Sequence, residues 1–154
     1  MTVVRVRTEC PFPATVEKLW PLLCDSRVDR RSALLSFLHV PQPIRCRLPG
    51  GAGGVGEERE CESDQGLVHQ RILEWVPRSR LSFRMERATL PQRGWIEGMS
   101  DEFDLVPQGA GSLVTRTTQV RVRGRFRIIK GFLLILGLRQ VHRIVFRSWR
   151  SSAG

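Results

Sequence analysis

GRFRIIKGFLLILGLRQVHRIVFRSW occupies residues 124–149, and this stretch predicts one long helix at the end of the chain. It contains no proline, it begins at a glycine, and its apolar residues recur at helical spacing. The two apolar lines are Phe126, Ile129, Leu133 and Leu136, and Leu134, Leu138, Val141 and Val145. At a helical rise the stretch would be on the order of 40 Å long, enough to cross a small domain.

The two halves of this stretch differ in polarity. Residues 128–138 are apolar on nearly every side except at Lys130, whereas from Arg139 onward basic and apolar residues alternate. The apolar run is about half of the roughly 20 residues that a bilayer span needs. We therefore expect a buried core helix, with a helix on a membrane surface as the alternative. Gly131 and Gly137 weaken a helix, so they predict the close approach of a strand, a bend or room for a ligand.

The composition is that of an ordinary globular domain, with 154 residues of which 41% are hydrophobic and 26% charged. We expect one domain over residues 1–154, because no linker, repeat or low-complexity segment interrupts the chain. The net charge of +10 would suit nucleic acid, a membrane surface or an acidic ligand. Because the arginines are spread along the chain and there is no tyrosine, we interpret the charge as compositional and expect no nucleic-acid partner.

The N-terminus has no long apolar segment, so we predict no secretory signal and a cytoplasmic location. The four cysteines lack the spacing of metal ligands, and we expect neither a metal nor a cofactor. Cys46 and Cys61 fall on strands that are neighbours in the predicted sheet, where they could face each other. In a reducing compartment we nevertheless expect the thiols to stay reduced.

Before the long helix, the pattern predicts one strand followed by two short helices. Alternation over residues 2–10 indicates a half-buried strand, and apolar residues recur at helical spacing in residues 14–24. Pro21 lies inside that helical pattern and should kink the helix or end its first part. Asp25 and Ser26 then offer a cap for a second short helix or turn over residues 28–35.

From residue 41 to residue 122 the periodicity changes to two, which is typical of strands. The six predicted strands cover residues 44–48, 56–63, 67–76, 81–87, 94–106 and 112–122. Short turns join them, so they should pair as an antiparallel meander. The link GGAGGVG at residues 50–56 lacks the GK[ST] ending of a phosphate-binding loop. The chain therefore predicts an α+β fold, with a curved sheet of six to seven strands around the last helix and a cavity where they do not touch.

Four further pieces of sequence resemble a known superfamily. They are PATVEKLWPLLCD, GVGEEREC, RILEWVPRSRLSF and DEFDLVPQGAGSLVTRT, which begin at residues 13, 54, 71 and 101. Together with the order of elements, they resemble the START-like superfamily, also called SRPBCC or polyketide cyclase/dehydrase. The resemblance implies the helix-grip fold over nearly the whole chain. Its members carry lipids, bind hormones or secondary metabolites, or cyclise polyketides, and the resemblance implies no catalytic residue by position.

The strand over residues 94–106 supplies the sharpest local hypothesis. The face with its larger apolar residues should point inward, and it carries Trp95, Glu97, Met99, Asp101, Phe103 and Leu105. Buried carboxylates need partners, and Arg116 on the next strand is available to Glu97 and Asp101. The alternative is that these groups lie in solvent at the sheet ends or form an inert ion pair.

The remaining candidates are an acid–base set and a ligand-binding set. Glu97, Asp101 and His69 are the candidates for general acid or base, with His142 as a further histidine. A lone histidine such as His69 or His142 is more often a satisfied structural residue than a catalyst. The predicted ligand-binding residues are Trp75, Phe83, Met85, Trp95, Met99, Phe103, Arg116 and Leu133. The alternative is that these side chains fill the core and leave no cavity.

Three functions follow from these features. The first is the binding of a hydrophobic small molecule (a lipid, a quinone or a polyketide-like compound), with any acidic group attracted by the arginines. The second is a polyketide cyclase or dehydratase that uses the acid–base candidates. The third is an adaptor whose Arg139, Arg143 and Arg147 meet an acidic protein, RNA or a membrane surface.

The chain could be a monomer or a homodimer, with Phe146 and Trp149 near its end available for a dimer contact or the core.

Overall fold

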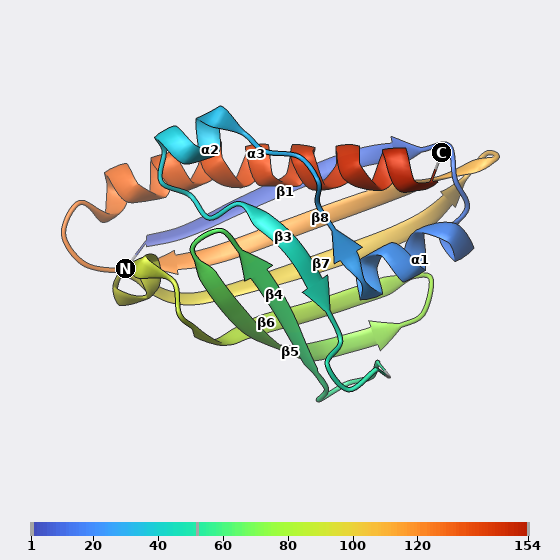
Figure 1. Cartoon of the computed structure of the whole chain (residues 1–154), viewed down its shortest axis with the longest axis horizontal. Helices are drawn as coiled ribbons and strands as arrows, with labels where there is room; N and C mark the ends of the chain where they lie inside the picture. The colour runs from blue at the N-terminus through green and yellow to red at the C-terminus, as the bar shows by residue number, and fades with distance from the viewer. Residues whose placement is uncertain (1, 52, 154) are drawn as a thin grey trace.

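A curved antiparallel sheet wraps along one long helix in the computed structural model, which describes residues 2–51 and 53–153. The long helix is α3 (Arg127–Ala153), and it runs alongside β1 (Thr2–Phe12) and β8 (Gly111–Val122), as Figure 1 shows. No helix in the described ranges is both long enough and apolar enough to span a bilayer. The sheet wrapped along α3 confirms the predicted helix-grip arrangement and the α+β class.

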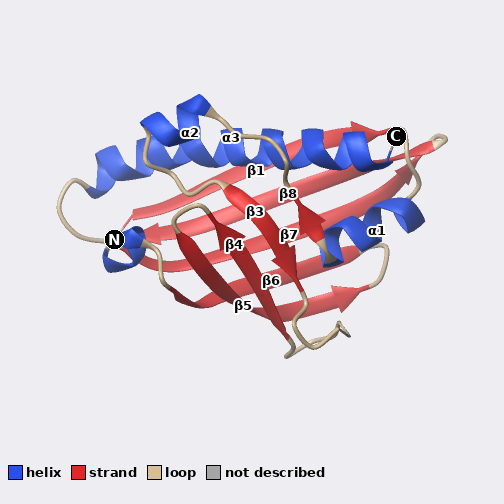
Figure 2. Ribbon diagram, viewed as in Figure 1, coloured by secondary structure: helices blue, strands red, loops and turns tan. Residues whose placement is uncertain are grey.

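The sheet has eight strands in the order β1-β8-β7-β6-β5-β4-β3-β2, and all neighbours are antiparallel (Figure 2). The other strands are β2 (Ser26–Arg27), β3 (Pro43–Arg47), β4 (Glu58–Ser63), β5 (Gly66–Val76), β6 (Arg80–Ala88) and β7 (Ile96–Gln108). The other helices are α1 (Val16–Cys24), α2 (Ala33–Phe37) and the short 3₁₀ helix η1 (Pro91–Gly94). Pro11 lies in β1, an edge strand, where its missing N–H is tolerated.

The strand β2 accounts for the difference from the six to seven strands expected. Ser26 and Arg27 pair with β3 instead of capping a helix, and α2 begins only at Ala33. The hydroxyl of Ser32 caps α2 by accepting a hydrogen bond of 3.3 Å from the N–H of Leu35. Pro21 does not end α1, which continues to Cys24.

The long helix begins three residues later than the sequence pattern predicted. Gly124 and Phe126 both have positive φ angles, 92° and 59°, so the chain turns sharply before the first helical residue, Arg127. A Cβ at Gly131 would lie 3.1 Å from Val4 in β1, which confirms the expected close approach of a strand. At Gly137 a Cβ would lie 2.6 Å from the side chain of Val40, in the segment between α2 and β3. Both glycines therefore let other parts of the chain pack tightly on α3.

The core has two parts along α3. The larger part packs the second half of the helix against α1 and the sheet, and it includes Phe12, Leu19, Phe83, Phe103, Phe146 and Trp149. The smaller part packs Leu134 and Leu138 against valines of β1 and β8. Trp149 is 1% exposed, and its indole N–H donates a hydrogen bond of 2.9 Å to Ser26. Phe146 and Trp149 therefore belong to the core and are not available for a dimer contact.

A disulfide joins Cys46 in β3 to Cys61 in β4, contrary to the expectation that these thiols stay reduced. The two residues are directly opposite each other in the antiparallel pair β3–β4. The bond covalently links β3, the neighbour of edge strand β2, to β4 and so to the rest of the sheet. Cys10 and Cys24 are free thiols.

We expect reduction of this disulfide to lower the free energy of unfolding by about 3 kcal/mol, because the bond closes a loop with a sequence separation of 15. Denaturant titrations with and without a thiol reductant measure this difference. The double variant Cys46→Ala/Cys61→Ala serves as the control, since a reductant should leave its stability unchanged. Equal stability of the wild-type protein under both conditions would contradict the expectation.

Candidate ligand-binding cavity

A cavity of about 220 Å³ lies between the inner face of the sheet and α3. The sheet contributes Val68, Met99, Phe103 and Val120 to its wall, and α3 contributes Leu133, Leu134, Leu138, Val141, Val145 and Trp149. It lies where the two parts of the core meet, because lining residues come from both. The disulfide Cys46–Cys61 also forms part of the wall.

The cavity opens near the first half of α3. Among the lining residues, Trp95, Leu133 and Lys130 reach the surface, and the Lys130 ammonium lies 5.1 Å from the centre of the Trp95 indole. The strands β6 and β7 separate on this side. Their pairing covers only Arg80–Arg84 of β6, opposite Ser100–Asp104 of β7, and does not extend to the start of β7. Lining residues that reach the surface on this side belong to η1 (Gln92), to the segment between α2 and β3 (His39) and to α3 (Leu133), so these elements border the mouth.

Asp101 is the only acidic residue that is buried in the described part of the chain, with 3% exposure. The Arg116 guanidinium donates a hydrogen bond of 3.0 Å from Nε to Asp101 Oδ1, and the hydroxyl of Thr118 donates to the same oxygen. All three residues line the cavity. The predicted pairing of a buried carboxylate with Arg116 is therefore present for Asp101.

His142 extends this hydrogen-bonded group across the core. Its Nε2 lies 2.8 Å from Thr118 Oγ1, and its Nδ1 lies 2.8 Å from Thr8 Oγ1. Since the Thr118 hydroxyl hydrogen is donated to Asp101, the Nε2–H of His142 must donate to Thr118, and Nδ1 accepts from Thr8. The imidazole is fully buried, and burial together with the nearby Arg116 charge lowers the pKa of His142 to about 2. His142 is thus neutral in the folded protein.

Arg59 in β4 is a second buried cation in the cavity wall, with 3% exposure. Its Nη1 donates hydrogen bonds to Gln70 Oε1 (2.9 Å) and Cys61 Sγ (3.1 Å), and its Nη2 donates to the Leu23 carbonyl (3.3 Å). The guanidinium lies 4.4 Å from the centre of the Phe83 ring. Burial lowers the pKa of Arg59 to about 10, so the side chain is still charged at neutral pH.

None of these partners of Arg59 is an anion, and its buried Nε has no hydrogen-bond partner. Asp101, whose negative charge acts on Arg59, is already bonded to Arg116. The buried wall of the cavity therefore carries two guanidinium groups and one carboxylate, which leaves an excess of one positive charge. This arrangement favours a ligand with an anionic group.

The predicted ligand-binding residues separate into two groups. Trp95, Met99, Phe103, Arg116 and Leu133 line the cavity. Trp75, Phe83 and Met85 do not. Trp75 packs against Trp20 and against the backbone at Gly53, where a Cβ would lie 1.9 Å from the indole. Phe83 is part of the core beneath Arg59.

Glu97 is exposed and lies outside the cavity, unlike its predicted neighbours on β7. The cause is a β-bulge: Ile96 pairs with Val122 and Gly98 pairs with Arg121, so Glu97 is an extra residue on its strand. Ile96 lines the cavity at this end of the strand, and the predicted alternation holds from Met99 onward. A bulge changes which residues face inward without leaving a clear mark in the apolar pattern.

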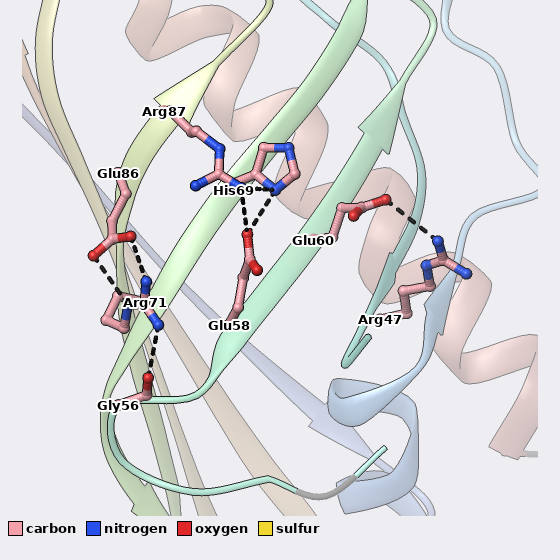
Figure 3. Close-up of polar contacts among 8 residues, drawn as sticks. All are labelled: Arg47, Gly56, Glu58, Glu60, His69, Arg71, Glu86 and Arg87. Carbon is pink, nitrogen blue, oxygen red and sulfur yellow. Dashed lines mark hydrogen bonds and ion pairs between the residues drawn. The ribbon is translucent and has the colours of Figure 1, made fainter. Parts of the chain in front are cut away.

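His69 lies on the outer face of the sheet. Figure 3 shows its ring beside Glu58 and Arg87, with Nδ1 of His69 2.7 Å from Glu58 Oε1. Its neighbours along β5, Val68 and Gln70, are the ones that line the cavity. His69 thus belongs to a network of ion pairs on the outer surface, which also includes Arg71–Glu86 and Arg47–Glu60.

Arg59 was not among the site residues predicted from the sequence. A signal was available in the stretch EERECE at residues 57–62, where Arg59 and Cys61 alternate with glutamates. An arginine that shares a strand face with a cysteine, opposite a face of glutamates, is a candidate for an inward-facing cation. In the structure Glu58 and Glu60 point to the outer surface, as Figure 3 shows, whereas Arg59 is buried.

No group of three potential metal-ligating side chains occurs within residues 2–51 and 53–153.

Comparison with known proteins gives one family match. The family described as "Polyketide cyclase / dehydrase and lipid transport" matches residues 3–145. No curated protein gives a significant match in sequence.

Several solved structures share the fold. A START superfamily protein from Mycobacterium smegmatis has a TM-score of 0.67 and 10% identity, and the match covers 97% of this chain and 96% of that chain. Ara h 8.0201 has a TM-score of 0.65 and 15% identity, with coverage of 99% and 98%. A protein from Chromobacterium violaceum has a TM-score of 0.59 and 12% identity, with coverage of 97% and 96%. At these identities the likeness shows the fold alone.

The low pKa of His142 predicts that acid destabilises the protein through this residue. In the unfolded chain, His142 takes up a proton once the pH drops below its ordinary pKa of 6.5. In the folded protein it does so only near pH 2, so the free energy of unfolding decreases as the pH is lowered through this range. Lowering the pH from about 7.5 to about 5.5 should therefore decrease the free energy of unfolding by about 1.4 kcal/mol through this residue. Denaturant titrations at a series of pH values measure the slope. The variant His142→Gln should lose this part of the slope, and an unchanged slope would contradict the assignment.

Proposed function

The chain belongs to the polyketide cyclase / dehydrase and lipid transport family and has the START-like fold, and from this we propose that its cavity binds an apolar small molecule that carries an acidic group. Lipids, quinones and polyketide-like compounds with such a group are the candidate classes. The apolar wall formed by residues such as Met99, Leu134 and Val141 would bury the carbon skeleton.

The single observation that carries this proposal is the uncompensated charge of Arg59. Its Nε is buried, has no partner and belongs to a side chain in the cavity wall. A carboxylate or enolate of a ligand could accept a hydrogen bond from this Nε and neutralise the excess positive charge. A neutral ligand of the same shape would gain the apolar contacts but would leave Arg59 unpaired.

A matched pair of probes tests the proposal. Decanoate and decan-1-ol share an apolar chain and differ in charge, and the tryptophan fluorescence of the protein, to which Trp95 and Trp149 in the cavity wall contribute, can report their binding. We expect the wild-type protein to bind decanoate more tightly than decan-1-ol. The substitution Arg59→Met should weaken decanoate binding by roughly ten- to a hundredfold and leave decan-1-ol binding nearly unchanged.

The control is Arg45→Met, which alters a cation at the cavity rim that is already paired with Asp25. This substitution should change the affinity for decanoate much less than Arg59→Met does. Equal losses for both probes in Arg59→Met would show that Arg59 has only a structural role. Failure of the wild-type protein to bind either probe would overturn the proposal that the cavity binds apolar molecules.

A second candidate function is that of a cyclase or dehydratase with Asp101 as acid or base. The observation that favours it is the hydrogen-bonded chain from Thr8 through His142 and Thr118 to Asp101, which ends at the cavity surface. Such a chain could adjust the position of a proton at Asp101 when a substrate binds. Of the three acid–base candidates, Asp101 is the one that lines the cavity.

Turnover of a linear β-polyketone thioester, followed by mass spectrometry, tests this second function. The wild-type protein should accelerate cyclisation over buffer, and Asp101→Asn should reduce the rate by at least about a hundredfold. Because Asp101→Asn also leaves Arg116 without its counterion, Thr118→Val provides a second variant that keeps the ion pair and interrupts the chain. A rate equal to that in buffer for the wild-type protein would exclude this reaction.

A further inference from the structure

Large apolar side chains are exposed at the start of α3. Phe126, Ile128, Ile129 and Phe132 have exposures of 71%, 74%, 59% and 61%, and Leu133 and Leu136 follow with 39% and 38%. We call these six residues the apolar patch; they belong to the orange turns of α3 and the segment just before them in Figure 1. A contiguous group of large exposed apolar side chains is unfavourable in water and indicates an interaction surface.

The patch is one face of the helix. The opposite side of α3 is buried against the sheet and against the segment between α2 and β3 that contains Val40. This side includes Gly131, Leu134 and Leu138. Helical spacing then places Ile128, Ile129, Phe132 and Leu136 together on the opposite, outward side. Further along the same outward side the helix carries Arg139, Arg143 and Arg147, all exposed. The outward face of α3 therefore changes from apolar to cationic along its length.

The part of the chain that contains the patch carries charge of one sign. Ten basic residues and no acidic residue follow Asp104, so this last part of the chain accounts for the whole net charge of +10. This corrects the earlier interpretation that the excess charge is spread along the sequence. Arg123, Arg125 and Arg127 are exposed beside the patch. Of the basic residues after Asp104, Arg116 is the one that forms an ion pair within the described ranges.

We propose that the apolar patch and its flanking arginines dock on the surface of a bilayer that contains anionic lipids. Apolar side chains would enter the boundary between headgroups and acyl chains, and the arginines would contact lipid phosphates. A second copy of the chain fits less well, because a symmetric contact through the patch would bring Arg123, Arg125 and Arg127 of both copies together. The combination of apolar and cationic groups matches the two layers of a lipid surface.

Docking in this way would place the cavity mouth against the lipid. Leu133 belongs to the apolar patch and also lines the cavity, and Lys130 and Trp95 lie at the mouth beside it. An apolar ligand could then pass between bilayer and cavity with little exposure to water. This consequence rests on the proposed function, whereas docking itself does not.

Sedimentation with vesicles tests the docking directly. We expect the protein to bind vesicles of phosphatidylcholine mixed with phosphatidylserine, to bind phosphatidylcholine vesicles at least about tenfold more weakly, and to dissociate as salt is raised. The variant Ile128→Ser/Phe132→Ser should weaken binding to the mixed vesicles by at least about tenfold, and so should Arg123→Glu/Arg127→Glu. All four side chains are exposed, so these variants should keep the fold, which circular dichroism can check.

The matched controls change exposed residues of the same types elsewhere. Val76→Ser/Val106→Ser removes two exposed apolar side chains of the sheet, and Arg78→Glu/Arg84→Glu reverses two exposed charges. Neither should alter vesicle binding by more than about twofold. Absence of binding to the mixed vesicles, or equal losses in control and patch variants, would overturn the proposal. Self-association in solution that Ile128→Ser/Phe132→Ser abolishes, without vesicle binding, would assign the patch to a second copy instead.

Discussion

A curved sheet of eight strands has an inner face that must be covered, and among the helices of the described residues α3 alone runs far enough to cover it. This constraint explains the arrangement of the whole molecule. The second half of α3 meets the sheet through aromatic side chains such as Phe146 and Trp149, with α1 closing the same end. The first half reaches the sheet through Gly131, Leu134 and Leu138, which pack near β1 and β8 without an aromatic side chain. The cavity lies where helix and sheet are held apart, and both the fold and its binding capacity follow from the same packing problem.

The interior combines apolar packing with a small number of charged groups whose hydrogen bonds are nearly complete. Asp101, Arg116, Thr118 and His142 satisfy one another, so they keep the centre of the sheet polar without an unpaired charge. Arg59 is the exception, because its hydrogen-bond partners are neutral and its Nε has none. Buried polar groups are usually satisfied, and a departure from that rule inside a cavity is therefore informative about a ligand.

Much of the fold was predictable because apolar periodicity reports directly on which residues face the core. The C-terminal helix, the meander and the inward face of β7 from Met99 to Leu105 all followed from it. Features that depend on single residues in three dimensions were not predictable in this way. The bulge at Glu97 reverses one residue, and His69 lies on the outer face of β5. Cys46 and Cys61 face each other as their neighbouring strands allowed, but the assumption of a reducing compartment led to the wrong expectation of free thiols. Arg59 escaped notice because a lone arginine in a strand ordinarily points to water.

The sheet has two parts, which we call plates: β1-β8-β7 and β6-β5-β4-β3-β2. They are joined only where Arg80–Arg84 of β6 pair with β7. The ladders β1–β8, β7–β8 and β5–β6 are longer than this join, whereas β3–β4 and β2–β3 at the far edge are shorter. The disulfide lies within the second plate and so does not stiffen the join. Before Ser100 of β7 no ladder pairs join β6 to β7, so separation of the two strands there would enlarge the space beneath α3 without breaking this join. The size of molecule that the cavity can take would then depend on this unpaired end of the sheet as well as on the side chains that line the cavity at rest.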